Sequence, residues 1–471
     1  MTSLPIPLHA LRTRASATDY SLAVPADARR QLARGWLWLS MLALVGSGLF
    51  SILLVVSRTP GLNGLLPVAD FFRVALVVHV DLSVLVWFVA IGALLWSLDS
   101  APRALAWGRA ALALAGVGAL LMTVAPFAGH VEAPIMANYI PVLDGPVFLA
   151  GLVVFGIGAA LLVLRSLWLA PRVGLRIDGA AALRFGLNAS VVATAVALFA
   201  FAWSFAVLPA SLDGKASYEI AFWGGGHALQ FTWTLLMLVA WLWLASASGA
   251  PVQLSPRIAL LMFALALASV FVTPYAYLAH DVATVEHRNL HTAAMRFGGG
   301  VAILPVALAV LLSLLPLRAI EASRRPLRAA LVSSMLLFAA GGLIGLLIGG
   351  NNVKIPAHYH GCIVGVTLAL MGLVYHLLPR LGYGTPQGRL AVAQPCLYGA
   401  GQLLHIAGLV WSGGYGVQRK VAGSEQVLRS SAEVAGMGLM GLGGLLAIAG
   451  GLLFVVVVVR ALRQPGLQAP P

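Results

Sequence analysis

Histidines in this 471-residue chain are spaced in ways that suit haem or metal chemistry. His358 and His360 are two residues apart, so on a helix their side chains point about 200° apart. Such a pair cannot chelate one ion, but it can reach two cofactors on opposite sides of the helix. His79, from an earlier segment, could be the second axial ligand of one of them. A haem with two histidine ligands suits electron transfer, whereas one with a single histidine leaves its iron open to a small molecule.

A glycine run and a carboxylate mark two further groups of residues. Three consecutive glycines, residues 224–226, precede His227. Because glycine costs about 1 kcal/mol per residue within a helix, the run predicts that a flat group such as a porphyrin face presses on the backbone; close helix packing is the alternative. His280 and Asp281 are adjacent, and together with His227 they form a set that binds non-haem Fe(II). Alternatively, Asp281 is an exposed residue that pairs with Arg288.

Composition indicates which kind of protein positions these side chains. The chain is 60% hydrophobic and only 9% charged, whereas a soluble domain carries roughly 25% charged residues. Apolar runs long enough to cross a bilayer predict an all-α integral membrane bundle of twelve helices. Its catalytic membrane domain covers 36–460, between tails at 1–35 and 461–471. The twelve predicted spans are 36–56, 71–98, 105–127, 143–167, 184–208, 221–247, 257–280, 291–316, 327–350, 356–378, 392–412 and 432–460.

The distribution of basic residues predicts the orientation of the bundle. The tail at 1–35 is basic, and Lys and Arg are concentrated in the segments on the same side as that tail. Both termini are therefore expected on the cytoplasmic side, and the membrane is expected to be a bacterial inner membrane. The net charge of +14 therefore reports topology and does not indicate nucleic-acid binding. This orientation places five histidines in the outer third of the bundle: His79, His227, His280, His358 and His360.

Several of these segments resemble the catalytic subunit of the haem-copper oxidase superfamily, which includes oxygen reductases and nitric oxide reductases. The segments are His79 to Trp87, the glycine run with His227, the end of the seventh span, and His358-Tyr359-His360-Gly361. The resemblance covers essentially the whole chain. It implies two haems, with type b favoured, and one non-haem metal, either iron or copper.

The resemblance also implies roles for individual residues. His79 and His360 would ligate the low-spin haem, and His358 the high-spin haem. His227 and His280 would hold the non-haem metal. Arg419 and Lys420 resemble a basic pair that meets haem propionates.

Two departures from the family pattern affect the predicted substrate. The family usually has two adjacent histidines where this chain has His280-Asp281. One turn after His227, many oxygen reductases have a tyrosine and the usual nitric oxide reductases a glutamate, but here the residue is Phe231. The pattern resembles divergent nitric oxide reductases in which a carboxylate replaces a metal histidine. We therefore expect reduction of nitric oxide to nitrous oxide, with iron held by His227, His280 and Asp281.

The alternative is reduction of dioxygen to water at a haem-copper centre, with another tyrosine in place of the missing one. Tyr277 is the first candidate, since it precedes His280 and Asp281 by three and four residues and shares their face; simple packing is the other explanation. Tyr275 is a second candidate. The remaining histidines are assigned other roles: His130, His287 and His291 at the outer surface, and His376 and His405 as structural residues.

Acidic residues suggest the direction of proton supply. The inner halves of the sixth, seventh and eighth spans carry no titratable side chain, so we expect protons to enter from outside and turnover not to pump. The candidates for proton entry on the outer side are Glu132, Asp144, Asp213, Glu219 and Glu286. Asp81, inside the second span, has either a structural or a relay role.

Partners follow from the absence of a recognisable electron-accepting domain in the sequence. We expect membrane lipid around the bundle and an electron-donating subunit, cytochrome c, quinol or cupredoxin as donor. Two other classes of protein fit the pattern of residues less well. A secondary transporter would place ionisable residues at the midplane, which is nearly empty here. A haem-handling membrane protein could use outward histidines, but it would have no need for a second metal set.

Overall fold

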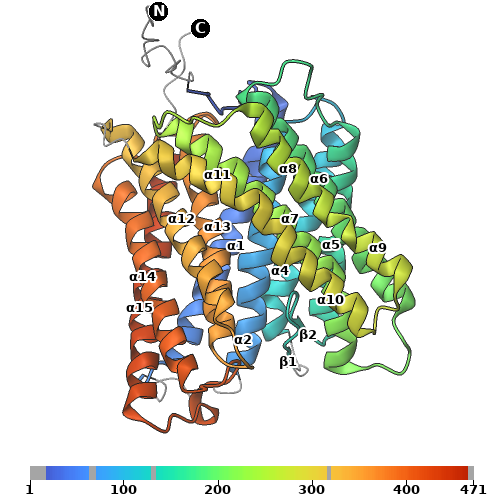
Figure 1. The fold of residues 1–471 in the computed structure, drawn as a ribbon, viewed down its shortest axis with the longest axis vertical. Coiled ribbons are helices and arrows are strands. Elements are labelled where there is room, and N and C mark those ends of the chain that lie inside the picture. The colour runs from blue at the N-terminus through green and yellow to red at the C-terminus, as the bar shows by residue number, and fades with distance from the viewer. Residues whose placement is uncertain (1–16, 63–70, 129–133, 316–319, 465–471) are drawn as a thin grey trace, which may run out of the picture.

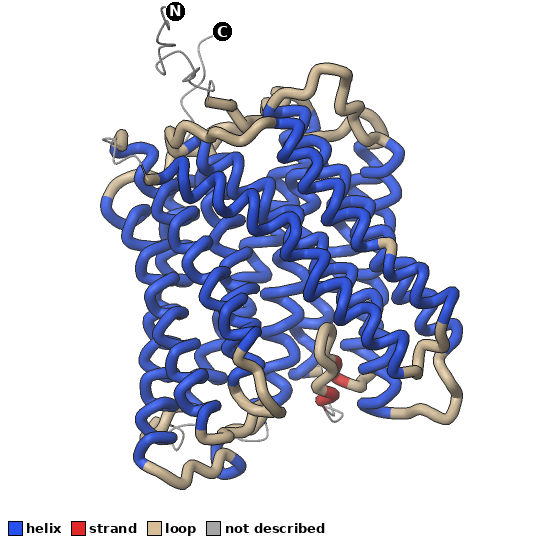
Figure 2. Tube along the Cα trace, in the orientation of Figure 1, coloured by secondary structure: helices blue, strands red, loops and turns tan. Residues whose placement is uncertain are grey.

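The structure, a computed structural model, describes residues 17–62, 71–128, 134–315 and 320–464. Figure 1 shows long helices that run along one bundle, and Figure 2 shows how little of the chain is anything else. Among the described residues the strands are β1 (Pro134–Ile135) and β2 (Val142–Leu143), which pair antiparallel with Pro134 opposite Leu143. This hairpin lies at one end of the bundle (Figure 1).

The helices alternate in direction along the chain, and some spans contain more than one helical segment. In the first half they are α1 (Ala28–Arg58), α2 (Phe71–Val80), the π-helix η2 (Asp81–Val86), α3 (Trp87–Leu98), α4 (Leu105–Val124), the 3-10 turn η3 (Ala125–Phe127), α5 (Pro146–Trp168), α6 (Gly179–Val207) and α7 (Gly214–Ala247). In the second half they are α8 (Pro256–Val270), α9 (Val272–Ala279), α10 (Val285–Ala293), the π-helix η4 (Ala294–Gly298), α11 (Gly299–Leu314), η5 (Ala322–Arg324), α12 (Arg325–Leu346), α13 (Lys354–Leu377), α14 (Arg389–Gly414), η6 (Gly423–Glu425) and α15 (Ser431–Leu462).

The predicted membrane bundle of about twelve helices is confirmed. Eleven spans in the described chain are long and apolar enough to cross a bilayer. The twelfth predicted span, 392–412, is the helix α14. Its polar residues Gln394, Gln402 and His405 lower its hydropathy, which explains why length and composition alone do not single it out.

The predicted start of the eighth span is wrong. That span was expected to begin at residue 291, but α10 begins at Val285. Thr284 caps it, since its side-chain oxygen accepts a hydrogen bond from the backbone N–H of His287. His287 and His291 therefore lie inside a helix and are 0% and 1% exposed, not at the outer surface as predicted.

The two ends of the described chain meet at the same end of the bundle. The N–H of Gly384 donates to Ala461 O at the end of α15, and Arg34 near the start of α1 donates to Leu381 O. An even number of crossings accounts for this arrangement. Which side of the membrane this end faces stays a prediction.

The two most enclosed spans carry the histidines that matter most to the predicted site. The most apolar stretch of α7 is 94% buried and that of α13 is 83% buried, against 67% or less for the other spans of the described chain. The histidines on these helices are His227 on α7 and His358 and His360 on α13. The apolar stretches of these two helices are therefore shielded from lipid by the surrounding helices.

Glycines let pairs of helices approach until their backbones touch. A Cβ added at Gly408 of α14 would overlap Met440 N of α15, and one at Gly443 of α15 would overlap His405 N. Gly341 of α12 and Gly361 of α13 meet in the same way. These contacts are of the small-residue kind that brings helices together in membranes.

We expect Gly408→Ala to lower stability by about 1–3 kcal/mol, because neither backbone can move aside for the added methyl group. The thermal unfolding midpoint in detergent would report the loss. Gly438→Ala on the packed partner α15 is the control, since nothing lies within 4 Å of its added Cβ and alanine favours helix. Equal midpoints for the two variants would contradict the role given to this contact.

Candidate functional site

One hydrogen bond recurs on the buried histidines. In five buried or half-buried histidines, the ring nitrogen Nδ1 contacts a backbone carbonyl oxygen at 2.8–3.0 Å. A carbonyl only accepts, so Nδ1 carries the proton and Nε2 presents a free lone pair, the form in which histidine ligates a metal. The pairs are His79 with Ser47 O, His227 with Trp223 O, His291 with His287 O, His358 with Gly341 O, and His405 with Met440 O.

His79 lies at the junction of α2 and the π-helix η2. Ser47 of α1 holds it twice, through its carbonyl at 3.0 Å and its hydroxyl at 2.9 Å from Nδ1. Ser83 donates to the carbonyl of His79 at 2.6 Å. Asp81 is buried, and neither of its carboxylate oxygens has a hydrogen-bond partner among the described residues. The structure therefore does not show the hydrogen-bonded role that the sequence left open for Asp81.

His358 and His360 face different helices, as their spacing predicts. Nδ1 of His358 donates to Gly341 O on α12 at 2.8 Å, which the close contact between Gly341 and Gly361 makes possible. The ring of His360 lies 4.7 Å from that of His405 on α14. The two side chains therefore address two separate spaces in the bundle.

His405 belongs to the same cluster as His360, although it was predicted to be only structural. Its Nδ1 donates to Met440 O at 3.0 Å, and it interacts electrostatically with His79. The sequence does not show this role, because the neighbours of His405 come from other helices: His360 from α13, Met440 from α15 and His79 from α2. His79, His360 and His405 are thus neighbours. A low-spin haem would need two of these three histidines as ligands.

Around His227 the structure gathers two histidines that the sequence placed elsewhere. The ring of His291 lies 5.8 Å from that of His227, and the rings of His287 and His291 are 4.6 Å apart. All three side chains are buried. Both ring nitrogens of His287 and Nε2 of His291 have no hydrogen-bond partner among the described residues.

The predicted set of His227, His280 and Asp281 does not form a group of metal-ligating side chains in the described chain, although His280 interacts electrostatically with His287. His280 ends α9, and Asp281 is exposed in the loop before α10. The alternative pair with Arg288 is not formed either, because Arg288 stacks on the ring of Trp223 at 4.8 Å. The chain turns away from α7 at residue 281 and returns with α10, so His287 and His291 face His227 instead.

The glycine run before His227 packs against aromatic side chains of the protein itself, and this replaces the expected porphyrin contact. A Cβ added at Gly224, Gly225 or Gly226 would overlap, in order, Tyr277, Phe201 and Tyr139. The run therefore lets three rings approach one turn of α7. Two of them are tyrosines that flank the histidine cluster.

Tyr139 is the functional candidate that the sequence analysis missed. It lies in the loop between β1 and β2, and its phenol oxygen is 2.9 Å from Nε2 of His227. Burial, with Tyr359 and Glu219 nearby, raises the pKa of Tyr139 well above its usual range. The neutral phenol therefore donates its proton to the one nitrogen of His227 that is free to accept it.

The two tyrosines proposed from the sequence differ in position. Tyr277 is buried against His287, with ring centroids 4.7 Å apart, so it does reach the cluster. Its hydroxyl, however, bonds Ser204 Oγ at 2.6 Å and Ala200 O at 3.1 Å, away from His227. Tyr275 is 58% exposed on a helix that would face lipid, which removes it from the site.

The basic pair in the outer loop holds protein groups. Arg419 donates to Asn351 Oδ1 at 2.6 Å, and Lys420 donates to Met136 O at 2.6 Å. Burial, together with Arg419 and Lys215, lowers the pKa of Lys420 to about 8. Lys420 therefore fastens the loop that carries Tyr139, and a contact of this pair with propionates stays a prediction.

The predicted proton-entry acids are spread over the outer end. Glu132 and His130 lie outside the described residues. Asp144 accepts from Tyr218 at 2.9 Å, and Glu219 accepts from the side chain and the N–H of Asn138. Glu286 and Asp213 are exposed. Of the described acids, Glu219 is the one tied to a residue adjacent to Tyr139.

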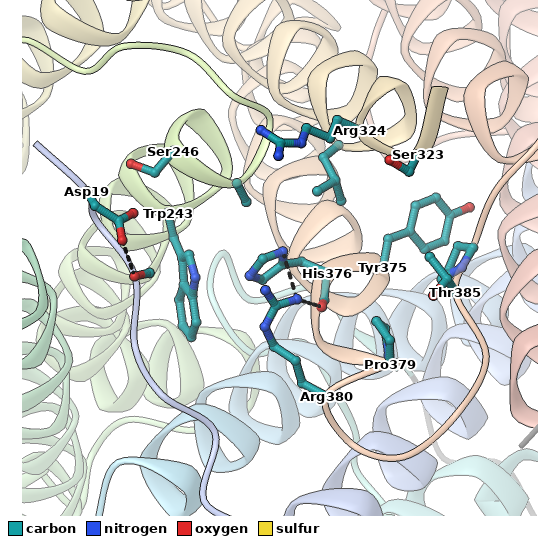
Figure 3. A pocket seen from close by; sticks show the side chains of 14 residues that line it. Asp19, Trp243, Ser246, Ser323, Arg324, Tyr375, His376, Pro379, Arg380 and Thr385 are labelled. Carbon is teal, nitrogen blue, oxygen red and sulfur yellow. Dashed lines mark hydrogen bonds between the residues drawn. The ribbon is translucent and has the colours of Figure 1, made fainter. Parts of the chain in front are cut away.

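A cavity of about 380 Å³ lies at the opposite end of α7 and α13, and it is not part of this site (Figure 3). Trp243, His376, Arg380 and Arg324 are among the residues that line it. Trp243 follows His227 by sixteen residues, or about 24 Å along a helix. Between them α7 is buried and almost entirely apolar, so the cavity and the histidine layer are separate.

The described residues fit both haem and a non-haem metal. His79 and His405 border one space and His358 another, and their Nδ1 contacts leave Nε2 free. At the third site, three buried imidazole nitrogens have no hydrogen-bond partner among the described residues, which is costly unless a metal binds them. No three metal-ligating side chains of the described chain already stand at coordinating distance, so metal binding has to draw the rings together.

Comparison with known proteins identifies the family. Residues 31–453 match the family described as "Cytochrome C and Quinol oxidase polypeptide I". The chain belongs to this family. Members of this oxidase polypeptide I family are catalytic subunits of the haem-copper oxidase superfamily, so the chain is an integral multi-pass membrane subunit of that superfamily.

The relatives of this oxidase polypeptide I chain do not narrow its substrate. An uncharacterized protein of Rickettsia prowazekii (strain Madrid E) is 29% identical over 90% of this chain and 95% of its own length. An uncharacterized protein of Aquifex aeolicus (strain VF5) is 27% identical over 75% and 86%. A cryo-EM structure of a heme-copper terminal oxidase dimer superposes with a TM-score of 0.72 at 17% identity, over 95% of this chain and 86% of that one. That likeness shows the fold.

We expect His360→Leu to remove one of two haems, because a low-spin haem held by two histidines loses an axial ligand. His405→Leu should keep both, since His405 lies beside His360 as an additional ring. Haem per purified protein and the low-spin absorption band measure the difference. If instead His405→Leu lost the haem and His360→Leu kept it, the axial role would belong to His405.

Proposed function

We propose that this chain is the catalytic subunit of a membrane-bound terminal reductase that converts nitric oxide to nitrous oxide. The observation that carries the proposal is the buried group formed by His227, His287 and His291, in which both ring nitrogens of His287 and Nε2 of His291 have no hydrogen-bond partner among the described residues. This group lies on α7 and α10, while His358, which would hold the high-spin haem, lies on α13 against α12. Metals held by these two groups would supply the electrons for reduction of a small gas.

The side chains divide the work between electron transfer and chemistry. His79 and His360 would hold the low-spin haem, which would supply electron transfer from an outside donor. His358 alone would hold the second haem and leave one face open to the substrate. The haems and the non-haem metal supply the redox chemistry when bound. The proposal includes an electron donor, which would be another subunit, cytochrome c, quinol or a cupredoxin.

The residue at the family's tyrosine position supports nitric oxide as the substrate. Reduction of two nitric oxide molecules to nitrous oxide and water needs two electrons, which the haems and the metal would supply, and two protons, which would come from the outer end. Dioxygen needs four of each, and a tyrosine on the sixth span serves that need in many oxygen reductases. Here the position is Phe231, which is buried and carries no phenol. The exposed Asp281 no longer supports the choice.

Dioxygen reduction is the second candidate, because of Tyr139. A phenol 2.9 Å from His227 is placed to give a proton and an electron to a gas bound at this metal. Three histidines also suit copper as well as iron. The second candidate therefore pairs copper with Tyr139 as a redox residue.

Metal analysis of the purified complex tests the proposal. We expect two haem irons and one further iron per chain, with nitric oxide consumption as the main activity. His227→Ala should lose the third iron and at least 90% of activity, roughly the effect of removing a catalytic group, yet keep both haems. Stoichiometric copper with rapid dioxygen uptake would favour the second candidate. A fully active His227→Ala would refute the site, and an inactive wild-type complex with both haems would favour haem handling.

Proton supply from the outer end is part of the proposal. The inner half of α7 is buried and has no titratable side chain, and the polar contacts beside it are hydroxyls, such as Thr194 with Thr232 at 3.1 Å. At the outer end, Glu219 is joined to Asn138 next to Tyr139. An ionisable side chain, Glu219, therefore lies close to Tyr139 at the outer end, whereas the inner half of α7 carries none.

We expect turnover in proteoliposomes to consume protons from the side of Glu219 and to build no membrane potential. Glu219→Gln should slow turnover severalfold and leave haem and metal content unchanged. A pH-sensitive dye on each side and a potential-sensitive dye measure both quantities. Proton uptake from the side of the chain ends, with a generated potential, would contradict the outer route.

A further inference from the structure

We infer that Tyr139 is a ligand of the non-haem metal, so that the site consists of His227, His287, His291 and one phenol oxygen. The inference rests on the proposed function for the existence of that metal. The sequence offered Asp281 as the oxygen donor, but Asp281 is exposed and does not contact His227. Tyr139 instead reaches the site from the β1–β2 loop, on a different element from any of the three histidines.

The distance between the two donor atoms suits a shared metal. Ligand nitrogen and oxygen atoms lie about 2.0–2.2 Å from a bound first-row metal. Two ligands at right angles on such an ion are then about 2.9–3.1 Å apart. The phenol oxygen of Tyr139 and Nε2 of His227 are 2.9 Å apart. Because Trp223 O already holds Nδ1, Nε2 is the atom that would bind the ion. The metal would then take the place of the phenol proton that Nε2 accepts, and that proton would leave to solvent as the phenol oxygen becomes a phenolate ligand.

The ring of Tyr139 has little room to move away when a metal binds. It packs on the backbone at Gly226, where any Cβ would overlap it, and it meets the ring of Trp223 edge-on at 5.8 Å. The neighbouring Asn138 is held by Glu219, and Met136 O accepts from Lys420. The phenol oxygen would therefore stay beside Nε2 of His227 when a metal binds there.

The added oxygen donor favours iron at this site. Nitrogen donors alone bind copper well, while a site that mixes imidazole and hard oxygen ligands suits iron. In the sequence, the carboxylate of Asp281 favoured iron, whereas in the structure the oxygen donor is the phenol of Tyr139. The choice of metal in the proposed function thus depends on one side chain in an outer loop.

The test compares Tyr139→Phe with the wild-type complex, purified with both haems. We expect Tyr139→Phe to keep its haems but to bind non-haem iron at least tenfold more weakly, measured as iron per haem after competition with a chelator. Vibrational bands of an iron-bound phenol ring in the resonance Raman spectrum of the oxidised wild type should also disappear. Full iron content with unchanged bands in Tyr139→Phe would overturn the inference.

Tyr277→Phe is the matched control, because its phenol borders the same cluster but bonds Ser204 and Ala200. It should keep its non-haem iron. If Tyr139→Phe loses its haems through misfolding, Gly226→Ala serves instead: it keeps the phenol but displaces the ring, and retained iron affinity there would overturn the inference. A wild-type complex that holds copper or no third metal refutes the proposed function, whereas a wild-type third iron retained in Tyr139→Phe refutes only the role of Tyr139.

Discussion

The hydrogen bond from histidine Nδ1 to a backbone carbonyl is the constraint that organises this bundle. A helical carbonyl that already accepts from its own helix has a second lone pair to offer. His227 uses a carbonyl of its own helix, one turn back, whereas His79, His358 and His405 use carbonyls of neighbouring helices. The packing of α1 on α2, α12 on α13 and α14 on α15 is thus tied to the orientation of a ligand nitrogen. A shift of one helix would turn the lone pair away.

Glycine is what makes these interhelical contacts possible, and it does so in two different ways. At Gly361 and Gly443 the missing side chain lets two helix backbones come close enough for a carbonyl of one helix to accept from an imidazole of the other. Before His227, three glycines instead admit three aromatic rings. The same residue type therefore sets distances between helices in one place and admits side chains in another, which the sequence alone could not separate.

The sequence predicted the bundle and part of the site because both follow from simple patterns. Hydropathy gives the spans, and the two-residue spacing of His358 and His360 gives their divergence. The sequence missed the pair His287 and His291, although Thr284 as a helix cap and the four-residue spacing both point to a helical face. It also missed Tyr139, since no periodicity connects a short loop between two-residue strands to a histidine almost ninety positions later. Only the packed structure brings these two together.

A loop donor needs another kind of support than a helical one. Nonhelical backbone within a membrane protein is tolerated where protein groups satisfy it. Here charged groups do so at the outer end, since Glu219 accepts from Asn138 and Lys420 donates to Met136 O. Burial lowers the pKa of Lys420 to about 8, so its charge is retained below that pH and its hold on the loop is strongest there. The sequence suggested Glu219 for proton entry and Lys420 for contact with a haem propionate. In the structure these two residues also hold the loop in which the phenol of Tyr139 meets His227.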